Sequence, residues 1–101
     1  MIVLRNVFRL KPGRAGEFAR QMTETMQSPG GGPQPAAWRV LTDLSGPFDT
    51  VVFEMELDSL ATWERNRAEV FAQPAFRESF ERTADWIVSG SAEFYTIEGR
   101  S

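Results

Sequence analysis

The sequence predicts an α+β domain in which a four-stranded antiparallel sheet carries its helices on one face. Three observations support this fold class. Residues 45–48 form a turn signal between two segments that alternate apolar and polar side chains, which is the pattern of a β-hairpin. Two further alternating stretches, 2–10 and 91–98, lie near the two ends of the chain. The stretches 14–27 and 59–89 instead place apolar residues at helical spacing.

The first strand, at 2–10, divides its side chains between two faces. Lys11-Pro12-Gly13 ends it, and apolar residues then recur one helical turn apart up to residue 27. Residues 28–35 are expected to be a flexible surface connection, because their glycines precede prolines rather than the Gly-Lys-Ser/Thr of a phosphate-binding loop. One strand face carries Ile2, Leu4, Asn6, Phe8 and Leu10, the other carries Val3, Arg5, Val7 and Arg9, and the helix stripe is Ala15, Phe18, Met22 and Met26.

The hairpin has a predicted register. An even-length loop at 45–48 pairs Arg39 with Glu54 and Val40 with Phe53. This register sets apolar against apolar residues on one face and basic against acidic residues on the other. A shift by one residue would reverse both faces, so the register is well specified.

The second half of the chain predicts two helices and a final strand. Asp58 or Ser59 is the expected N-cap of the first helix. Pro74 interrupts the helical pattern and is expected in the first turn of the second helix, and Gly90 is expected to stop that helix before the last strand. The apolar stripe of the first helix contains Leu60, Trp63, Arg67, Val70 and Phe71, with Arg67 as its polar member.

This order of elements favours a ferredoxin-like βαββα(α)β fold, formed by a single domain over residues 1–101. The expected strand order is 4-1-3-2, which sets the first strand beside the third. The sheet face away from the helices then carries charges of both signs. Its glutamates are interpreted as an ion-pair network rather than as catalytic acids, because neighbouring arginines would keep them ionised. The charged residues of this face are Arg5, Arg9, Arg39, Glu54 and Glu56.

Composition excludes several kinds of chemistry. The 101 residues include no cysteine and no histidine, which removes thiolate nucleophiles, the usual general base and the commonest ligands of zinc and haem. Neither a metal nor a cofactor is therefore expected. The net charge of −3 disfavours a nucleic-acid partner. The N-terminal stretch alternates like a strand and no long apolar run is present, so we expect no membrane span and a cytoplasmic location.

Three segments together carry a family resemblance. They are the strand and turn at Ile2–Gly13, the Gly-Pro-Phe-Asp-Thr turn at 46–50, and the start of a helix at Leu57–Trp63. They resemble the dimeric α/β-barrel superfamily, most closely its NIPSNAP-like members, and the similarity covers nearly the whole chain. The resemblance implies a homodimer whose two sheets meet face to face. Its interface would hold Arg5, Arg9, Arg39, Glu54 and Glu56, with the apolar side chains of Val3, Val7, Leu41 and Val52 among them.

The same superfamily includes small oxygenases that work without metal or flavin, and the resemblance implies a pocket between the sheet and the helices. Those enzymes use an asparagine on the first strand and a tryptophan on the second helix, and Asn6 and Trp63 match these positions. The histidine of the haem-degrading members is missing, so haem degradation of that type is excluded. The ligand pocket would be lined by Leu4, Phe8, Phe53, Arg67 and Phe71.

Each singled-out residue also has a plainer interpretation, which we favour from the sequence alone. Asn6 can hydrogen-bond to nearby backbone, and Trp63 can pack in the core. Arg67 can extend to the surface along its apolar stem, although it could also set a cation at a pocket mouth for an anionic ligand. Tyr95, the only tyrosine, is interpreted as structural.

Two classes of function follow. The leading hypothesis is a homodimer that binds a small, largely apolar molecule and has no identifiable catalytic machinery. The alternative is a cofactor-independent monooxygenase for an electron-rich aromatic, in which Asn6 polarises the substrate and Trp63 forms one side of the pocket. An RNA-binding domain is rejected, because Glu54 and Glu56 occupy the strand face that would meet nucleic acid. A regulatory amino-acid-binding domain of similar topology stays open.

Overall fold

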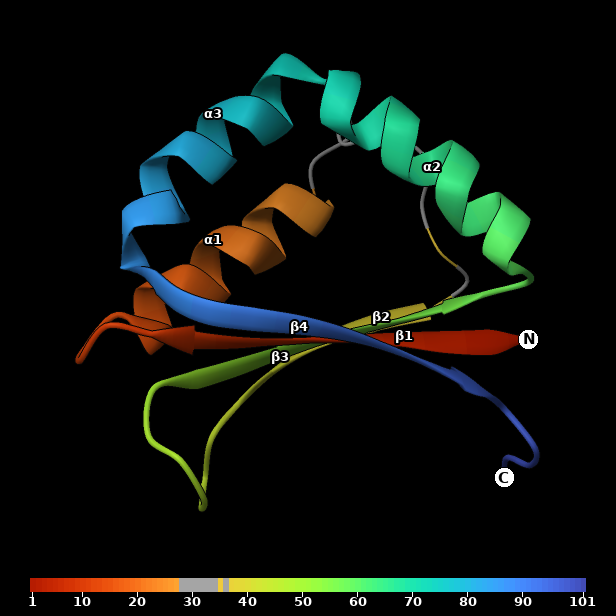
Figure 1. Ribbon diagram of the computed structural model, residues 1–101, viewed down its shortest axis with the longest axis horizontal. Helices are drawn as coiled ribbons and strands as arrows, with labels where there is room; N and C mark the ends of the chain where they lie inside the picture. Colours follow the sequence, from red (N-terminus) through yellow and green to blue (C-terminus); the bar gives the residue numbers. More distant parts are fainter. Residues whose placement is uncertain (28–34, 36) are drawn as a thin grey trace.

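The computed structural model describes residues 1–27, 35 and 37–101. The connection predicted at 28–35 therefore lies outside the described residues, apart from Pro35. In chain order the elements are β1 (Ile2–Leu10), α1 (Ala15–Gln27), β2 (Ala37–Thr42), β3 (Thr50–Leu57), α2 (Leu60–Ala72), α3 (Pro74–Thr83), a 3-10 turn (Ala84–Trp86) and β4 (Ile87–Thr96) (Figure 1).

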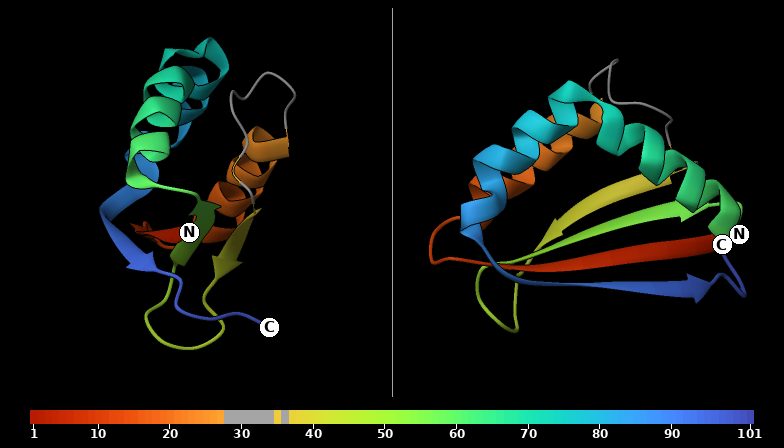
Figure 2. Two further views of the ribbon diagram at one scale, coloured as in Figure 1. Left: turned by 90° about the vertical axis from the view of Figure 1, so that its right-hand side faces the viewer. Right: turned by 45° about the horizontal axis from the view of Figure 1, so that its top comes forward.

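The four strands form one antiparallel sheet in the order β2-β3-β1-β4. This is the predicted order read from the opposite edge, and the α+β, ferredoxin-like fold class is confirmed. The helices α1, α2 and α3 lie on the same face of the sheet, whereas the β2–β3 loop and the C-terminal end turn to the other side (Figures 1 and 2). The sheet thus has a covered face and a second face that no described helix covers. We call the second one the uncovered face.

Pairing within the sheet gathers opposite charges on the uncovered face. Arg39 lies opposite Glu54 and Val40 opposite Phe53, as the hairpin loop predicted. Across the neighbouring strand, Arg5 also lies opposite Glu54. Because successive side chains of a strand point to opposite faces, the apolar partners in these pairs point to the helices.

The core lies between α1 and one end of the sheet. Phe18 of α1 is buried, and its ring meets that of Phe8 on β1 with 5.2 Å between centroids. Leu10 and Val51 complete the buried cluster beneath this helix. Burial of each such side chain contributes about 1.5–3 kcal/mol, so α1 is firmly joined to the sheet.

The helix α2 is attached more lightly. It begins at the cap Ser59, whose Oγ accepts a hydrogen bond from the backbone N–H of Thr62 at 3.2 Å, so Ser59 rather than Asp58 is the N-cap. None of the residues of α2 is fully buried, and Phe71 near its end is largely exposed. This helix lies over the sheet but is not tightly packed against it. Among the described helices, none is long and apolar enough to cross a membrane.

The last helix and strand begin and end differently from the prediction. Pro74 opens α3 as expected, but α3 ends at Thr83 and β4 begins at Ile87, whereas the pattern predicted helix up to residue 89. Ile87 pairs with β1, so sheet pairing overrides its helical spacing. Gly90 is not a helix stop: it lies within β4 opposite Phe8, where a Cβ would come within 3.4 Å of the ring. A Cβ here would make ordinary van der Waals contact with that ring, whereas a larger side chain would have to share its space.

Candidate functional site

Asn6 occupies the middle of β1 on the side that faces the helices. In the register of the sheet it lies between Phe53 of β3 and Ala92 of β4. The residue is half-buried, and its amide forms no hydrogen bond with any other described residue, yet neither amide atom is fully buried. The amide is therefore accessible from the helix side, with hydrogen-bonding capacity that the described part of the chain does not use.

Trp63, near the start of α2, packs on β4, the strand next to β1. Its ring meets that of Phe94 on β4 edge-on, with 5.0 Å between centroids and an interplanar angle of 81°. Phe94 pairs with Leu4, which is two residues from Asn6 along β1. Such a step along a strand is about 7 Å, so the ring pair of Trp63 and Phe94 lies over the part of β1 next to Asn6. The sequence analysis did not single out Phe94, because its contact with Trp63 depends on where α2 packs over the sheet.

The other predicted pocket residues divide into a floor and a rim. Leu4 and Phe53 are 2 % and 5 % exposed, so they belong to the packed floor. Phe8 is half-buried against the core. Phe71 of α2 is 44 % exposed and belongs to the rim.

Aromatic side chains continue from Trp63 along α2 and α3. The guanidinium carbon of Arg67 lies 5.3 Å from the ring centroid of Trp63 and 5.1 Å from that of Phe71. Phe71 meets Phe76 of α3 edge-on at 5.0 Å, and Phe76 stacks on Phe80 at 6.4 Å. We call this set the aromatic row: Phe94, Trp63, Arg67, Phe71, Phe76 and Phe80. Because Phe71 and Phe80 are largely exposed, the row is partly open to solvent.

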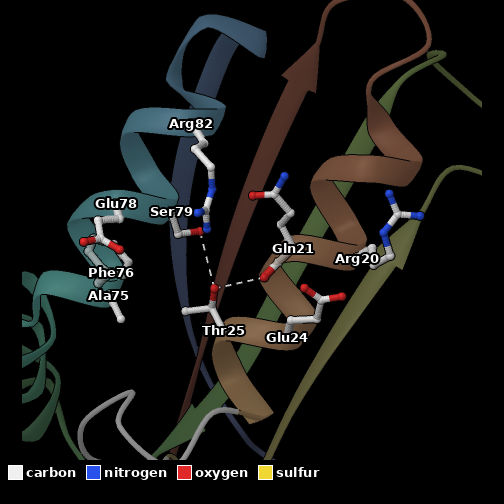
Figure 3. Close-up of a pocket in the computed structure, with 9 residues that line it drawn as sticks. All are labelled: Arg20, Gln21, Glu24, Thr25, Ala75, Phe76, Glu78, Ser79 and Arg82. Carbon is white, nitrogen blue, oxygen red and sulfur yellow. Dashed lines mark hydrogen bonds between the residues drawn. The ribbon is translucent and has the colours of Figure 1, made fainter.

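A cleft of about 490 Å³ lies between α1 and α3 (Figure 3). The hydroxyl of Thr25 on α1 donates to the Gln21 backbone carbonyl at 2.9 Å and lies 3.4 Å from Ser79 Oγ on α3. The side chains of Gln21 and Arg82 both extend into the space between these helices (Figure 3). Within the described residues, the side-chain oxygen of Gln21 is fully buried and has no hydrogen-bond partner.

The sequence analysis missed this cleft. Its signal is weak but readable: Gln21 and Thr25 are polar residues one helical turn apart, next to the apolar stripe of α1. Phe76 borders the cleft and also belongs to the aromatic row, so the two features adjoin. Asn6 and Trp63 line neither this cleft nor the one described below on the uncovered face.

Glu54 is the centre of the uncovered face. It is 6 % exposed and accepts hydrogen bonds from Arg5 Nε at 2.8 Å and from Arg39 Nε at 2.6 Å. Burial by itself acts to raise the pKa of Glu54, but the hydrogen bonds and charges of Arg39 and Arg5 outweigh it, so the pKa lies below its ordinary value. Glu54 is therefore ionised at neutral pH, which supports an ion-pair network rather than a general acid.

Other charges on this face have partners that the sequence did not indicate. Glu56 forms an ion pair with Arg100 of the C-terminal segment, which turns to this side of the sheet. The hydroxyl of Tyr95 donates to Glu93 at 2.9 Å, and this hydrogen bond raises the pKa of Tyr95. Arg9 forms no ion pair with a described residue. A cleft of about 350 Å³ lies among Arg5, Arg39, Glu54, Glu56 and Arg100.

A metal centre is not evident in this part of the chain. Across residues 1–27, 35 and 37–101, no group of three or more acidic side chains is arranged so that it could hold a metal ion. On the helix side the arrangement offers an amide, aromatic faces and the Arg67 guanidinium between two rings, and on the other side it offers paired charges.

Several solved proteins share this fold, and one family model matches the sequence. The NIPSNAP family model matches residues 3–98. An uncharacterised NIPSNAP-like domain protein from Burkholderia xenovorans has a TM-score of 0.81 at 23% identity, over 99% of this chain and 87% of that one. A NIPSNAP family protein of unknown function from Agrobacterium tumefaciens has a TM-score of 0.76 at 19% identity, over 93% and 85%. An antibiotic biosynthesis monooxygenase has a TM-score of 0.72 at 15% identity, over 98% and 100%. No curated protein matches the chain.

Proposed function

The chain belongs to the NIPSNAP family, and from this premise we propose that it acts as a homodimer that binds a small apolar or aromatic molecule between its sheet and its helices. The observation that carries this proposal is the half-buried amide of Asn6, which is unbonded within the described residues and lies on β1 beside the strand whose Phe94 contacts Trp63. Because neither amide atom is fully buried, both are free to form hydrogen bonds with a bound molecule.

The surrounding side chains favour an aromatic ligand. Trp63, Phe71 and Phe94, on the helix side of the sheet like Asn6, keep part of their ring surface exposed. Ligand sites in proteins are mostly apolar and aromatic, with a few polar groups that fix orientation. One amide among ring faces suits a flat molecule with a single polar substituent.

Isothermal titration with 2-naphthalenemethanol, a neutral aromatic alcohol, tests the ligand proposal. We expect saturable binding that weakens about fivefold in Asn6→Leu, since a neutral hydrogen bond contributes about 1 kcal/mol. Trp63→Ala should weaken it further. Tyr95→Phe is the matched control, because it removes a hydroxyl on the opposite face of the sheet and should leave binding unchanged. Equal affinity in Asn6→Leu and the wild-type protein would count against the site.

The homodimer is proposed from the chemistry of the uncovered face. Arg5 and Arg39 share one glutamate and keep 45% and 67% of their side-chain surface exposed, so their guanidinium groups can also pair with an acidic group of another molecule. Leu41, on the same face, is an exposed large apolar residue. A face with both charges and apolar side chains can pair with its own copy about a two-fold axis.

Light scattering at micromolar concentration tests the oligomeric state. We expect the mass of a dimer, and we expect Leu41→Arg to shift the molecule towards monomer. Leu60→Arg is the matched control, because Leu60 is also exposed but lies on α2, on the other side of the sheet. A monomer mass for the wild-type protein would refute the dimer.

A cofactor-independent monooxygenase is the second candidate. It is favoured by the positions of Asn6 on β1 and of Trp63 against the neighbouring β4, in a fold that is similar to that of an antibiotic biosynthesis monooxygenase. Oxygen consumption with anthrone as substrate is the test. Turnover that disappears in Asn6→Ala would support it, and no turnover by the wild-type protein would reject it. The cytoplasmic location stays a prediction.

A further inference from the structure

Arg67 is the one cation of the aromatic row, and two rings hold it in place. Trp63 precedes it by one turn of α2 and Phe71 follows it by one turn. The guanidinium lies 5.3 Å and 5.1 Å from the two ring centroids, within the range of cation–π attraction. Side chains four residues apart on a helix are neighbours, so this clamp forms within α2 alone. The cation therefore has a defined place on the rim of the proposed site.

No acidic residue neutralises this cation within the part of the chain that the structure describes. The four ion pairs there are made by Arg5, Arg14, Arg39 and Arg100. Glu64, three residues before Arg67 on α2, lies beyond ion-pair distance from it. Contact with ring faces leaves the edge of the planar guanidinium, where its N–H donors lie, available to another molecule.

We propose that Arg67 binds an anionic group of the ligand, and that the ligand is an aromatic carboxylate. This inference rests on the proposed ligand-binding function of the same site. Two parallel N–H donors of a guanidinium match the two oxygens of a carboxylate, which makes the pairing both strong and directional. The ring of the ligand lies against the exposed ring surface of Trp63 and Phe71, and Asn6 remains as a partner for a second polar substituent.

The neighbouring charges support a ligand-directed role for Arg67. Arg65, on the same helix, donates to the Thr62 hydroxyl at 3.2 Å and contacts no ring of the aromatic row. The two arginines thus have the same charge and nearly the same position along α2, but only Arg67 faces aromatic side chains. This difference provides a matched control.

Isothermal titration with three probes of one shape tests the inference: 2-naphthoate, 2-naphthalenemethanol and 2-naphthalenemethylammonium. We expect the wild-type protein to bind naphthoate about tenfold more tightly than the alcohol, as for a hydrogen bond to a charged group. Arg67→Gln should remove this preference, so that the variant binds naphthoate no more tightly than the alcohol. Arg67→Lys keeps the charge without the two parallel N–H donors, so it should retain part of the preference for naphthoate. Arg65→Gln should retain that preference fully.

The outcomes separate this inference from the proposed function. If the alcohol binds and naphthoate binds no better, the carboxylate inference is overturned and the ligand site stands. An equal loss of preference in Arg65→Gln also overturns it, because a general effect of helix charge would then be the cause. If none of the three probes binds, the proposed function fails and this inference fails with it. Thermal melts confirm folding, and Arg67→Lys carries the test if Arg67→Gln does not fold.

Discussion

The side chain of Asp49 accepts a hydrogen bond of 3.0 Å from the backbone N–H of Gly13. Asp49 ends the β2–β3 loop and Gly13 belongs to the turn after β1, so this bond joins two loops that are far apart in sequence. The backbone carbonyl of Asp49 also accepts from Leu10 N–H at 2.9 Å. Asp49 has a positive φ of 56°, a conformation that Asp and Asn tolerate better than most residues.

Replacing Asp49 should therefore destabilise the protein according to what replaces it. We expect Asp49→Ala to lower the free energy of unfolding by about 1–2 kcal/mol, from the lost hydrogen bond and the positive φ. Asp49→Asn keeps an acceptor oxygen and tolerates this backbone, so its loss should be about 0.5 kcal/mol or less. Urea unfolding measures both. Equal losses in the two variants would show that the bond to Gly13 contributes little.

The Glu54 network predicts a specific dependence of stability on pH. Burial acts to raise the pKa of Glu54, but the opposing effect of Arg39 and Arg5 is larger, so the folded-state pKa lies below the ordinary value of 4.5. The stabilisation is therefore fully present above about pH 4.5 and is lost as the pH falls through the folded-state pKa. Glu54→Gln should cost about 1–2 kcal/mol at neutral pH, because its two arginines remain partly exposed.

Measuring the free energy of unfolding at low and at neutral pH tests the direction of this pH dependence. At low pH the wild-type carboxyl is protonated and resembles an amide, so the difference between Glu54→Gln and wild type should shrink towards zero. Glu17→Gln is the control: its pair with Arg14 is exposed on both sides and should change stability by about 0.5 kcal/mol or less at any pH. A constant difference from neutral to acid pH would exclude the charge network as its source.

Gly90 should resist replacement by larger residues. A Cβ at this position would lie 3.4 Å from the Phe8 ring, and further methyl groups would press the ring into the core beside Phe18. We expect Gly90→Val to destabilise by about 1–3 kcal/mol, despite the higher β-propensity of valine. Ser89→Val, on the other face of β4, should be neutral or stabilising. Thermal unfolding of both variants measures this, and a stable Gly90→Val would mean that Phe8 can move away at little cost.

Gln21 offers a stabilising substitution. Its side-chain oxygen is fully buried without a partner in the described residues, and such a group costs about 1–3 kcal/mol. Gln21→Met keeps the length of the side chain and removes the unsatisfied carbonyl, so we expect an increase of about 1 kcal/mol in the free energy of unfolding. Denaturant titration is the measurement. A decrease would indicate that the oxygen is satisfied in solution, for example by a bound water molecule.

Much of the fold follows from local patterns, and so do parts of the candidate site. The alternation of residues around the hairpin specified its register, because a shift by one residue would expose the apolar face. The same alternation put Asn6 and Phe53 on the helix side, and Arg5 and Glu54 on the other side, as observed. The caps and turns at Ser59 and Pro74 are equally local. In each case the signal lies within a few residues of the feature it determines.

Contacts between distant segments could not be predicted in this way. Local spacing placed Ile87 in a helix, but pairing with β1 draws it into β4. The contact between Trp63 and Phe94 and the ion pair of Glu56 with Arg100 both depend on how distant segments meet. The sequence by itself determined the faces of the strands and the order of the elements, since each follows from the periodicity of a short segment. Only the tertiary structure decided which side chains meet between elements that are distant in the chain, because packing acts between residues that the chain brings together only on folding.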